Sequence, residues 1–273
     1  MVMERLLADF TIISMKELTV GMLKPLPALI ILAAAAVISY VQKLGLQKDM
    51  IYSVTRAFIQ LSVVAFLLDF ILRQKSVAWI LLAFIFMVIL AGHTAGTRAK
   101  HVPYGAFVAG VSIFVGTSIT MVILICVRAF PFTPHYIIPI MGMMVGSSMT
   151  ITGVTLKRLR DDLRLQKDMV ETALALGATP RQATLTQLKR ALTVALSPAL
   201  DNAKVVGLIS LPGAMTGLIM GGASPFEAIR LQIMVMNMNL GAATFSSILS
   251  TYLVCSFLFT STYQIKEKVI RVE

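Results

Sequence analysis

Residues 77–95 read VAWILLAFIFMVILAGHTA, and residues 105–127 read GAFVAGVSIFVGTSITMVILICV. Neither stretch contains Asp, Glu, Lys or Arg. Each is close to the roughly 20 apolar residues that a helix needs to cross the hydrocarbon core of a bilayer, where a charged side chain is costly. The short segment between them carries Arg98 and Lys100. The pattern predicts two consecutive transmembrane helices.

The remaining sequence repeats this pattern. Of its 273 residues, 57% are hydrophobic and only 14% are charged, whereas a soluble domain carries about 25% charged residues. We therefore predict an all-α, polytopic transmembrane helix bundle of about seven spans. The predicted spans are residues 25–41, 51–72, 77–95, 105–127, 136–154, 205–221 and 228–259. The last is too long for one straight crossing, which predicts either a strong tilt or a break near Gly241.

The spans divide the chain into five parts. These are an amphipathic leader (1–24), spans one to five (25–154), cytoplasmic amphipathic helices (155–204), spans six and seven (205–259) and a cytoplasmic tail (260–273). Most Lys and Arg residues fall on the side of the 155–204 loop, and cytoplasmic loops are the ones enriched in these residues. We therefore expect the N-terminus outside and the C-terminus inside, in a plasma membrane or an endomembrane. Topology accounts for the net charge of +11, so no nucleic-acid partner is expected.

The 155–204 loop has the pattern of two amphipathic helices joined at a glycine. Apolar residues recur at helical spacing in the first half: Leu156, Leu159, Leu163, Val170 and Leu174. Gly177 supplies a helix stop. Thr179 can cap a second helix, with Pro180 at its first position and Gln182 completing a capping box. Such a pair fits two roles, docking onto a partner protein or lying on the lipid surface.

Three stretches of sequence resemble a known family. Residues 171–177, ETALALG, resemble the Glu-Ala-Ala-x-x-x-Gly coupling loop of ABC-transporter permeases, with Thr172 in place of one alanine. The Ile-x-Leu-Pro motif that usually follows in importers is missing. Together with residues 141–146, MGMMVG, and 210–217, SLPGAMTG, the segment resembles FetB-type bacterial iron-export permeases. It resembles more closely the plant aluminium-sensitivity and sensitive-to-aluminium-rhizotoxicity membrane proteins.

The resemblance implies a permease that works with a separate ATP-binding protein. Its cargo would be iron in the bacterial branch and UDP-glucose in the plant branch, with aluminium tolerance as the outcome. The resemblance also implies a set of ATPase-coupling residues: Glu171, Ala173, Gly177, Thr179, Pro180 and Arg181.

The sequence has no Gly-x4-Gly-Lys-Ser/Thr loop to cradle ATP phosphates. We therefore expect a transport subunit that is not itself an enzyme and binds no cofactor, with ATP on a soluble ABC ATPase. Seven spans are few for a complete path, which favours a homodimer carrying two ATPase subunits. A secondary carrier or channel that needs no ATPase is the alternative class.

Neutral polar residues lie within the predicted spans, and their side chains could line a pathway or bond neighbouring helices. The candidate pathway residues are Gln60, Thr117, Ser147, Thr150, Thr216, Asn237 and Asn239. Hydroxyls and amides suit a polyhydroxylated solute better than a trivalent ion, which prefers carboxylates. No metal site is predicted, because Cys126 and Cys255 lie apart in apolar runs.

Small residues recur on single faces of two predicted spans, where they let helix backbones approach closely. The predicted packing residues are Gly142 and Gly146 in span five, and Gly213, Gly217 and Gly221 in span six. We expect these contacts to form within one subunit.

Overall fold

The computed structural model describes residues 27, 29–73, 77–100, 102–131, 133–260 and 264. The predicted leader, 1–24, lies outside them, and so does most of the tail, 260–273. Within the described ranges the regular elements are all helices, and bridge residues occur only at Val206, Ser210 and Phe259. The all-α prediction is therefore confirmed. The chain forms two units, Met1–Phe70 and Ile71–Glu273.

The first unit contains α2 (Leu29–Val41) and most of α3 (Gln47–Arg73). The turn between them uses left-handed backbone at Lys43 (φ 54°) and Gly45 (φ 73°). α3 has 27 residues and contains the predicted span 51–72. α2 has only 13 described residues, fewer than the roughly 20 that cross a bilayer.

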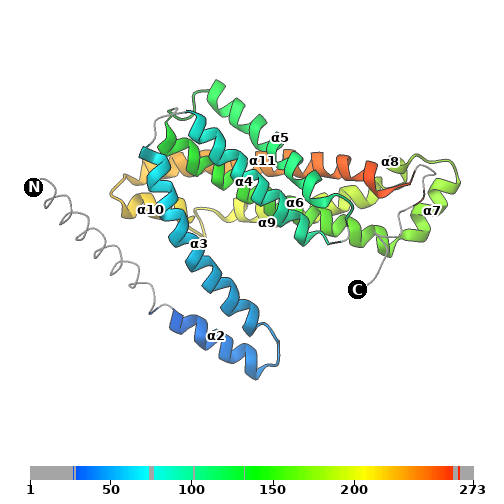
Figure 1. The fold of residues 1–273 in the computed structure, drawn as a ribbon, viewed down its shortest axis with the longest axis horizontal. Coiled ribbons are helices and arrows are strands. Elements are labelled where there is room, and N and C mark those ends of the chain that lie inside the picture. Colours follow the sequence, from blue (N-terminus) through cyan, green and yellow to red (C-terminus); the bar gives the residue numbers. More distant parts are fainter. Residues whose placement is uncertain are drawn as a thin grey trace, which may run out of the picture. The chain divides into compact units, whose positions relative to one another are not determined.

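The second unit is built around α4 (Val77–Arg98), α5 (Gly105–Cys126), α6 (Pro134–Leu165) and α11 (Pro225–Leu258). α4 and α11 each pack against both α5 and α6 (Figure 1). These four are the described helices that are long and apolar enough to cross a membrane. α4 and α5 correspond to the two uncharged stretches 77–95 and 105–127, which are confirmed as separate helices.

The predicted fifth span, 136–154, is only part of α6. This helix has 32 residues and continues to Leu165 without a break, because no Gly or Pro interrupts residues 154–165. Leu156, Leu159 and Leu163 are buried, with relative exposures of 0%, 1% and 1%. The first half of the predicted loop stripe therefore packs inside this chain.

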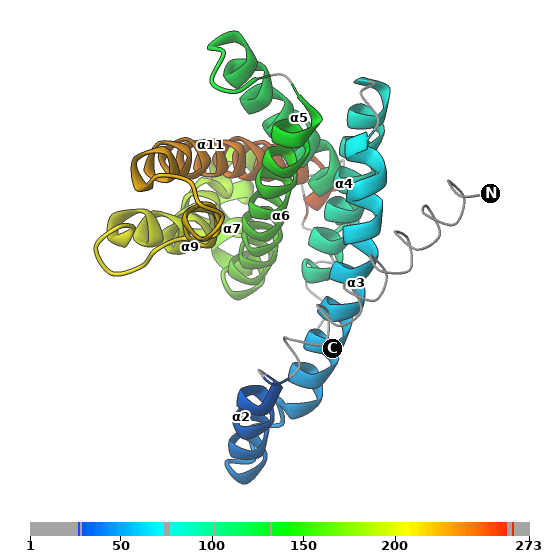
Figure 2. The same ribbon diagram turned by 90° about the vertical axis from the view of Figure 1, so that its left-hand side faces the viewer.

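Helix α9 (Leu185–Val205) returns along α6 and also contacts α11. Figure 2 shows α9 and α11 on one side of α6 and α4 on the other. Ala195 of α9 packs with Ile151 of α6 and Ala243 of α11. Pro198 lies inside α9 and does not end it. Part of the segment 155–204 therefore packs on residues of the predicted span 136–154, and its cytoplasmic placement stays a prediction.

The predicted span 205–221 does not form one helix, and this prediction is wrong. α9 ends at Val205, residues 206–212 are non-helical, and α10 (Gly213–Met220) has only 8 residues. The interruption has a physical cause, since Gly207 is left-handed at φ 83° and Pro212 precedes α10 as its N-cap. Eight residues extend about 12 Å, less than half of the roughly 30 Å hydrocarbon core.

The last apolar stretch forms α11, an unbroken helix of 34 residues. The Ser224 hydroxyl accepts a hydrogen bond from the Glu227 N–H at 3.3 Å and caps its start. The predicted break near Gly241 is absent, so that alternative is wrong. A helix of this length extends about 51 Å, longer than the roughly 30 Å hydrocarbon core. The alternative, a strongly tilted crossing, stays a prediction.

Candidate coupling corner and transmembrane cavity

The turn between α6 and α9 carries two short helices, α7 (Lys167–Ala175) and α8 (Pro180–Ala183). Gly177 separates them with φ at 90°, a backbone conformation that favours glycine. The Thr179 N–H donates to Gln182 Oε1 at 2.9 Å, and the Gln182 N–H donates to Thr179 Oγ1 at 3.4 Å. The predicted helix stop and capping box are both confirmed. We call residues 165–183 the coupling corner.

The coupling corner exposes both charged and apolar side chains. Glu171 pairs with Lys167 at 3.6 Å, and both side chains are about two-fifths exposed. Ala173 is half-buried, while Val170 is fully buried beneath α7. Three large apolar side chains remain open at this corner: Leu165 at 80%, Met169 at 63% and Leu176 at 84% exposure. An apolar surface at a polar turn marks a candidate protein contact.

One side-chain hydrogen bond joins α9 to the end of α6, and an ion pair lies within α6 beside it. Gln187 of α9, with 1% exposure, donates from Nε2 to Gln166 Oε1 at 2.8 Å. On α6, Arg158 pairs with the buried Asp162 at 3.3 Å. Bonded polar groups at a buried interface fix one arrangement of the two helices. The corner therefore sits on a defined hairpin.

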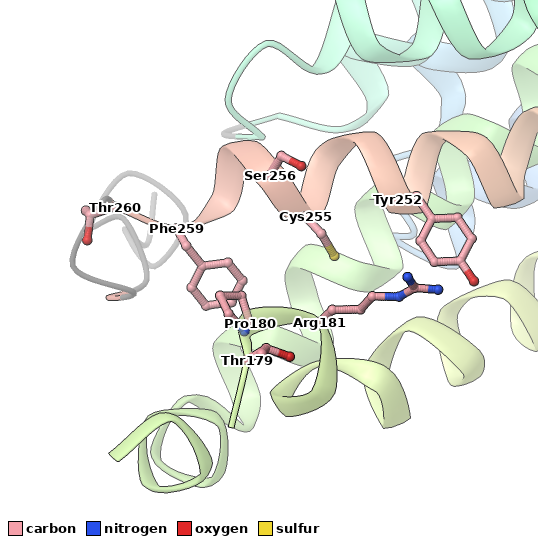
Figure 3. A pocket seen from close by; sticks show the side chains of 8 residues that line it. All are labelled: Thr179, Pro180, Arg181, Tyr252, Cys255, Ser256, Phe259 and Thr260. Carbon is pink, nitrogen blue, oxygen red and sulfur yellow. The ribbon is translucent and has the colours of Figure 1, made fainter. Parts of the chain in front are cut away.

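The coupling corner also contacts the C-terminal end of α11. The Arg181 guanidinium lies over the Tyr252 ring, 4.6 Å from its centroid. Thr184, at the end of α8, lies 3.8 Å from the buried Cys255 sulfur through its hydroxyl. A cavity of about 630 Å³ lies between these elements, with Phe259 beside Pro180 at its other wall (Figure 3). The coupling corner is therefore in direct contact with the C-terminal end of α11.

A second cavity, of about 440 Å³, lies between helices of the second unit. Its walls come from α6, α9, α11 and the non-helical residues 206–212. The polar lining side chains are all neutral: Ser147, Asn202, Ser210, Gln232 and Asn239. We call this space the amide cavity.

The predicted pathway residues are dispersed. Ser147 and Asn239 line the amide cavity, and Thr216 bonds to its wall, donating to the Pro212 carbonyl at 3.0 Å. The hydroxyls of Thr117 and Thr150 are bonded within their own helices, to Ile113 O and Gly146 O. Gln60 and Asn237 are exposed, and Gln60 belongs to the first unit.

Reasoning from sequence missed Asn202, Ser210 and Gln232. Gln232 carries a readable signal, since it is a polar residue inside the apolar stretch 228–259. Asn202 lies just before the predicted span 205–221, and Ser210 lies near the start of that span.

The predicted packing glycines differ from those that the structure uses. Cβ atoms added at Gly146, Gly213 or Gly217 would meet no described atom within 4 Å. At Gly142 the nearest is Met87 Sδ at 3.6 Å, and at Gly221 it is a carbonyl of its own helix.

The close approaches occur at other glycines, on α4 and α5. A Cβ on Gly92 would lie 2.6 Å from Gly110 Cα, and one on Gly96 would lie 2.5 Å from Ala106 Cα. Gly92 and Gly96 are four residues apart, which is the spacing that indicates such a seam. On α5, Gly116 faces the backbone of Ser246.

No group of three or more His, Cys, Asp or Glu side chains in the described ranges could hold a metal ion. Both cysteines are free, Cys126 exposed and Cys255 buried.

Comparison with known proteins identifies the family. The model of the Uncharacterised protein family UPF0014 matches residues 23–259. The UPF0014 membrane protein STAR2 of rice is 61% identical over 258 residues, which cover 94% of this chain and 90% of the relative. Protein ALUMINUM SENSITIVE 3 of Arabidopsis thaliana is 62% identical over 249 residues, covering 91% of each. The Probable iron export permease protein FetB of Escherichia coli is 37% identical over 238 residues, covering 87% of this chain and 92% of the relative.

No solved structure matches this chain significantly. The family match and the relatives confirm the resemblance seen in the sequence, including its greater similarity to the plant proteins. They also agree with the four apolar helices that are long enough to cross a bilayer. The chain is an integral membrane protein and belongs to the UPF0014 family.

Proposed function

We propose that the chain is the membrane-spanning permease subunit of an ABC-type transporter whose ATP is hydrolysed on a separate, soluble ATPase. The observation that carries the proposal is the coupling corner, a glycine-hinged turn that exposes apolar side chains and contacts α11 through Arg181 and Tyr252. The relative FetB is named as a probable iron export permease, which supports a permease role here.

The burial of the first amphipathic stripe favours docking on a protein over lying on lipid. Leu156, Leu159 and Leu163 are covered by this chain itself, so they are not available to dip into a lipid surface. Leu165, Met169 and Leu176 remain open at the turn and are available to a partner protein. A rigid partner that grips this turn can move the bundle as a body.

Each proposed coupling residue has a distinct task. Gly177 sets the direction of the turn, and Thr179 with Pro180 starts α8 in register. Glu171 offers a charge to the partner, while the small Ala173 leaves room beside it. Arg181 passes movement of the corner to α11 through Tyr252.

For the cargo, we propose export of UDP-glucose or a related hydroxyl-rich solute, with aluminium tolerance as the physiological outcome. The neutral lining of the amide cavity supports a hydroxyl-rich solute. The relative named ALUMINUM SENSITIVE 3 supports the link to aluminium. Iron export is the second candidate, and it is favoured by the 37% identity to FetB.

We also propose that two copies of the chain assemble with two ATPase subunits. The described part of one chain offers four helices long and apolar enough to cross a membrane, too few to enclose a wide path alone. Gly213 and Gly217 lie four residues apart on α10 with open space beside them, which suits contact with a second copy.

Co-purification of a tagged chain with its ATPase tests the docking proposal. Gly177→Pro and Glu171→Lys should lose the ATPase, because one changes the turn and the other reverses a charge at the contact. Asp201→Lys is the matched charge control, since Asp201 is exposed at the far end of α9. ATPase capture that is unchanged in both corner variants would contradict the proposal.

Flux into liposomes separates the classes of transporter. An ABC-type transporter should move solute only with the ATPase and ATP, whereas a secondary carrier or channel should move it without them. A panel of UDP-glucose, iron and aluminium species then distinguishes the candidate cargoes.

A further inference from the structure

The amide cavity lies beside the non-helical segment that separates α9 from α10. α9 ends and α10 begins on either side of residues 206–212, and Val206 and Pro212 both line the cavity. Inside this loop the Gly207 N–H donates to the Ser210 carbonyl at 3.0 Å, which closes a tight turn. Non-helical backbone within a membrane bundle is tolerated where it lines a cavity, and interrupted helices of transporters mark solute sites.

Two amide oxygens in the cavity wall lack hydrogen-bond donors. Gln232 Oε1 and Asn239 Oδ1 are buried, and neither accepts a hydrogen bond from any described residue. Gln232 as a whole is only 9% exposed. Leaving a buried acceptor unpaired costs about 1–3 kcal/mol, so such groups call for an explanation.

The two amides share one face of α11. They are seven residues apart, which is close to two helical turns, so their side chains project in the same direction. Met236 lies between them and also lines the cavity. Asn237, one residue further along, is exposed and does not line it. The cavity is therefore lined by the face of α11 that carries Gln232 and Asn239, and not by the face that carries Asn237.

We propose that the amide cavity binds the transported solute through an uncharged, hydroxyl-bearing group that donates hydrogen bonds to Gln232 and Asn239. Ser147, Asn202 and Ser210 complete the set of neutral partners. This inference rests on the transport function proposed above and names the chemistry of its solute site. The volume of the amide cavity, about 440 Å³, falls within the usual range for small-molecule sites, about 300–1,000 Å³.

The lining argues against two other kinds of ligand at this place. None of the side chains that line the cavity is charged, so nothing there balances a phosphate or a multivalent metal ion. Mg²⁺ and Ca²⁺ take carboxylate oxygens, and phosphate groups take Arg or Lys. The group held here is therefore neutral, whatever charge the rest of the solute carries.

Solute-induced stabilisation tests the site directly, with glucose as the neutral hydroxyl-rich probe. The full chain in detergent should show a higher melting temperature in glucose than in the same concentration of inorganic phosphate or of Fe³⁺. Gln232→Leu and Asn239→Leu should abolish the glucose shift and still fold, because an apolar group replaces an unpaired one. The matched control Asn237→Leu should keep the full shift. A glucose shift that persists in both cavity variants, or stabilisation only by phosphate or Fe³⁺, would overturn the proposal.

Cysteine labelling tests the same site without depending on the melting temperature. In a Cys126→Ser, Cys255→Ser background, Gln232→Cys should react with a small water-soluble thiol reagent, and glucose should slow that reaction several-fold. The control is Asn237→Cys, whose labelling rate should not respond to glucose. If glucose leaves the rate of Gln232→Cys unchanged while phosphate slows it, the site holds an anion and the proposal fails.

The two proposals fail in different ways. If the chain captures its ATPase but glucose neither stabilises it nor slows labelling, the transport function stands and the solute site is wrong. If glucose binds as expected but no ATPase is captured, the solute site stands and ATP-driven transport is wrong.

Discussion

At the scale of single residues, two glycines on neighbouring helices have opposite surroundings. A Cβ added at Gly116 of α5 would lie 2.7 Å from the Ser246 backbone nitrogen of α11. A Cβ added at Gly146 of α6 would meet no described atom within 4 Å. The same substitution should therefore have opposite consequences at the two positions.

We predict that Gly116→Ala lowers the free energy of unfolding by about 1–3 kcal/mol, because α5 and α11 must separate to admit the methyl group. Gly146→Ala should be neutral or stabilise α6 by up to about 1 kcal/mol, since alanine is the better helix former. Thermal unfolding of the two purified variants in one detergent measures the difference. Equal melting temperatures would show that α5 and α11 are not in close contact at Gly116.

Single residues were predictable where chemistry is local. The capping box of Thr179 and Gln182 and the stop at Gly177 depend on neighbours three residues apart or fewer, and the structure has them as predicted. Whether a glycine packs closely against another helix depends on which helix lies opposite it. The sequence of the glycine's own helix does not show this. Gly213 and Gly217 show the spacing of a seam, yet a Cβ added at either would meet no described atom within 4 Å.

At the scale of elements, α11 is continuous through Gly241, where the sequence permitted a break. A Cβ added there would meet no atom within 4 Å among the described residues. We predict that Gly241→Ala is neutral or stabilises the chain by up to about 1 kcal/mol, as in other helix interiors. Gly241→Pro should cost about 3 kcal/mol or more, because it removes a helix hydrogen bond. Thermal unfolding tests the pair, and a tolerated proline would mean that α11 bends at this point.

The contact between α8 and α11 gives a second prediction at this scale. We expect Tyr252→Leu to lower the amount of solute moved per ATP hydrolysed, because Arg181 loses the ring that links the corner to α11. The contact is worth only about 0.5–1 kcal/mol at an exposed site, so the fold and ATPase capture should persist.

Tyr252→Phe is the matched control, since its ring still attracts the guanidinium and should preserve coupling. The measurement is the ratio of solute flux to ATP hydrolysis in reconstituted vesicles. A Tyr252→Leu ratio equal to that of the wild type would show that force does not pass through this contact.

Elements were predictable where apolar length alone defines them, as for α4 and α5. The predicted span ended at residue 154, where charged residues begin, but α6 continues to Leu165. Charged residues indicate where a predicted span should end, and they do not end the helix itself. The segment 205–221 was misread because its apolar composition imitates a span, although Gly207 and Pro212 interrupt it. Apolar composition indicates that a segment avoids water. Whether its backbone forms a continuous helix depends on individual residues such as Gly207 and Pro212.

At the scale of the whole molecule, the coupling corner and the C-terminal end of α11 lie on the same side of the bundle. Arg181 and Tyr252 join them directly. The loop between α5 and α6 lies at the other end of α6, a helix of 32 residues that extends about 48 Å. That length is enough to cross the hydrocarbon core of roughly 30 Å, so we expect the two ends of α6 on opposite sides of the membrane.

This arrangement predicts a labelling pattern for the intact membrane. In a Cys126→Ser, Cys255→Ser background, Leu176→Cys should react with a membrane-impermeant thiol reagent only from the cytosolic side, because the ATPase must reach the corner there. Val127→Cys, at the end of α5, should react only from the other side. Both positions are open in the structure, at 84% and 72% exposure, so neither result depends on unfolding. Labelling of Leu176→Cys from outside the cytosol would place the corner beyond the reach of any ATPase, and the chain could then not be driven by ATP in the way proposed.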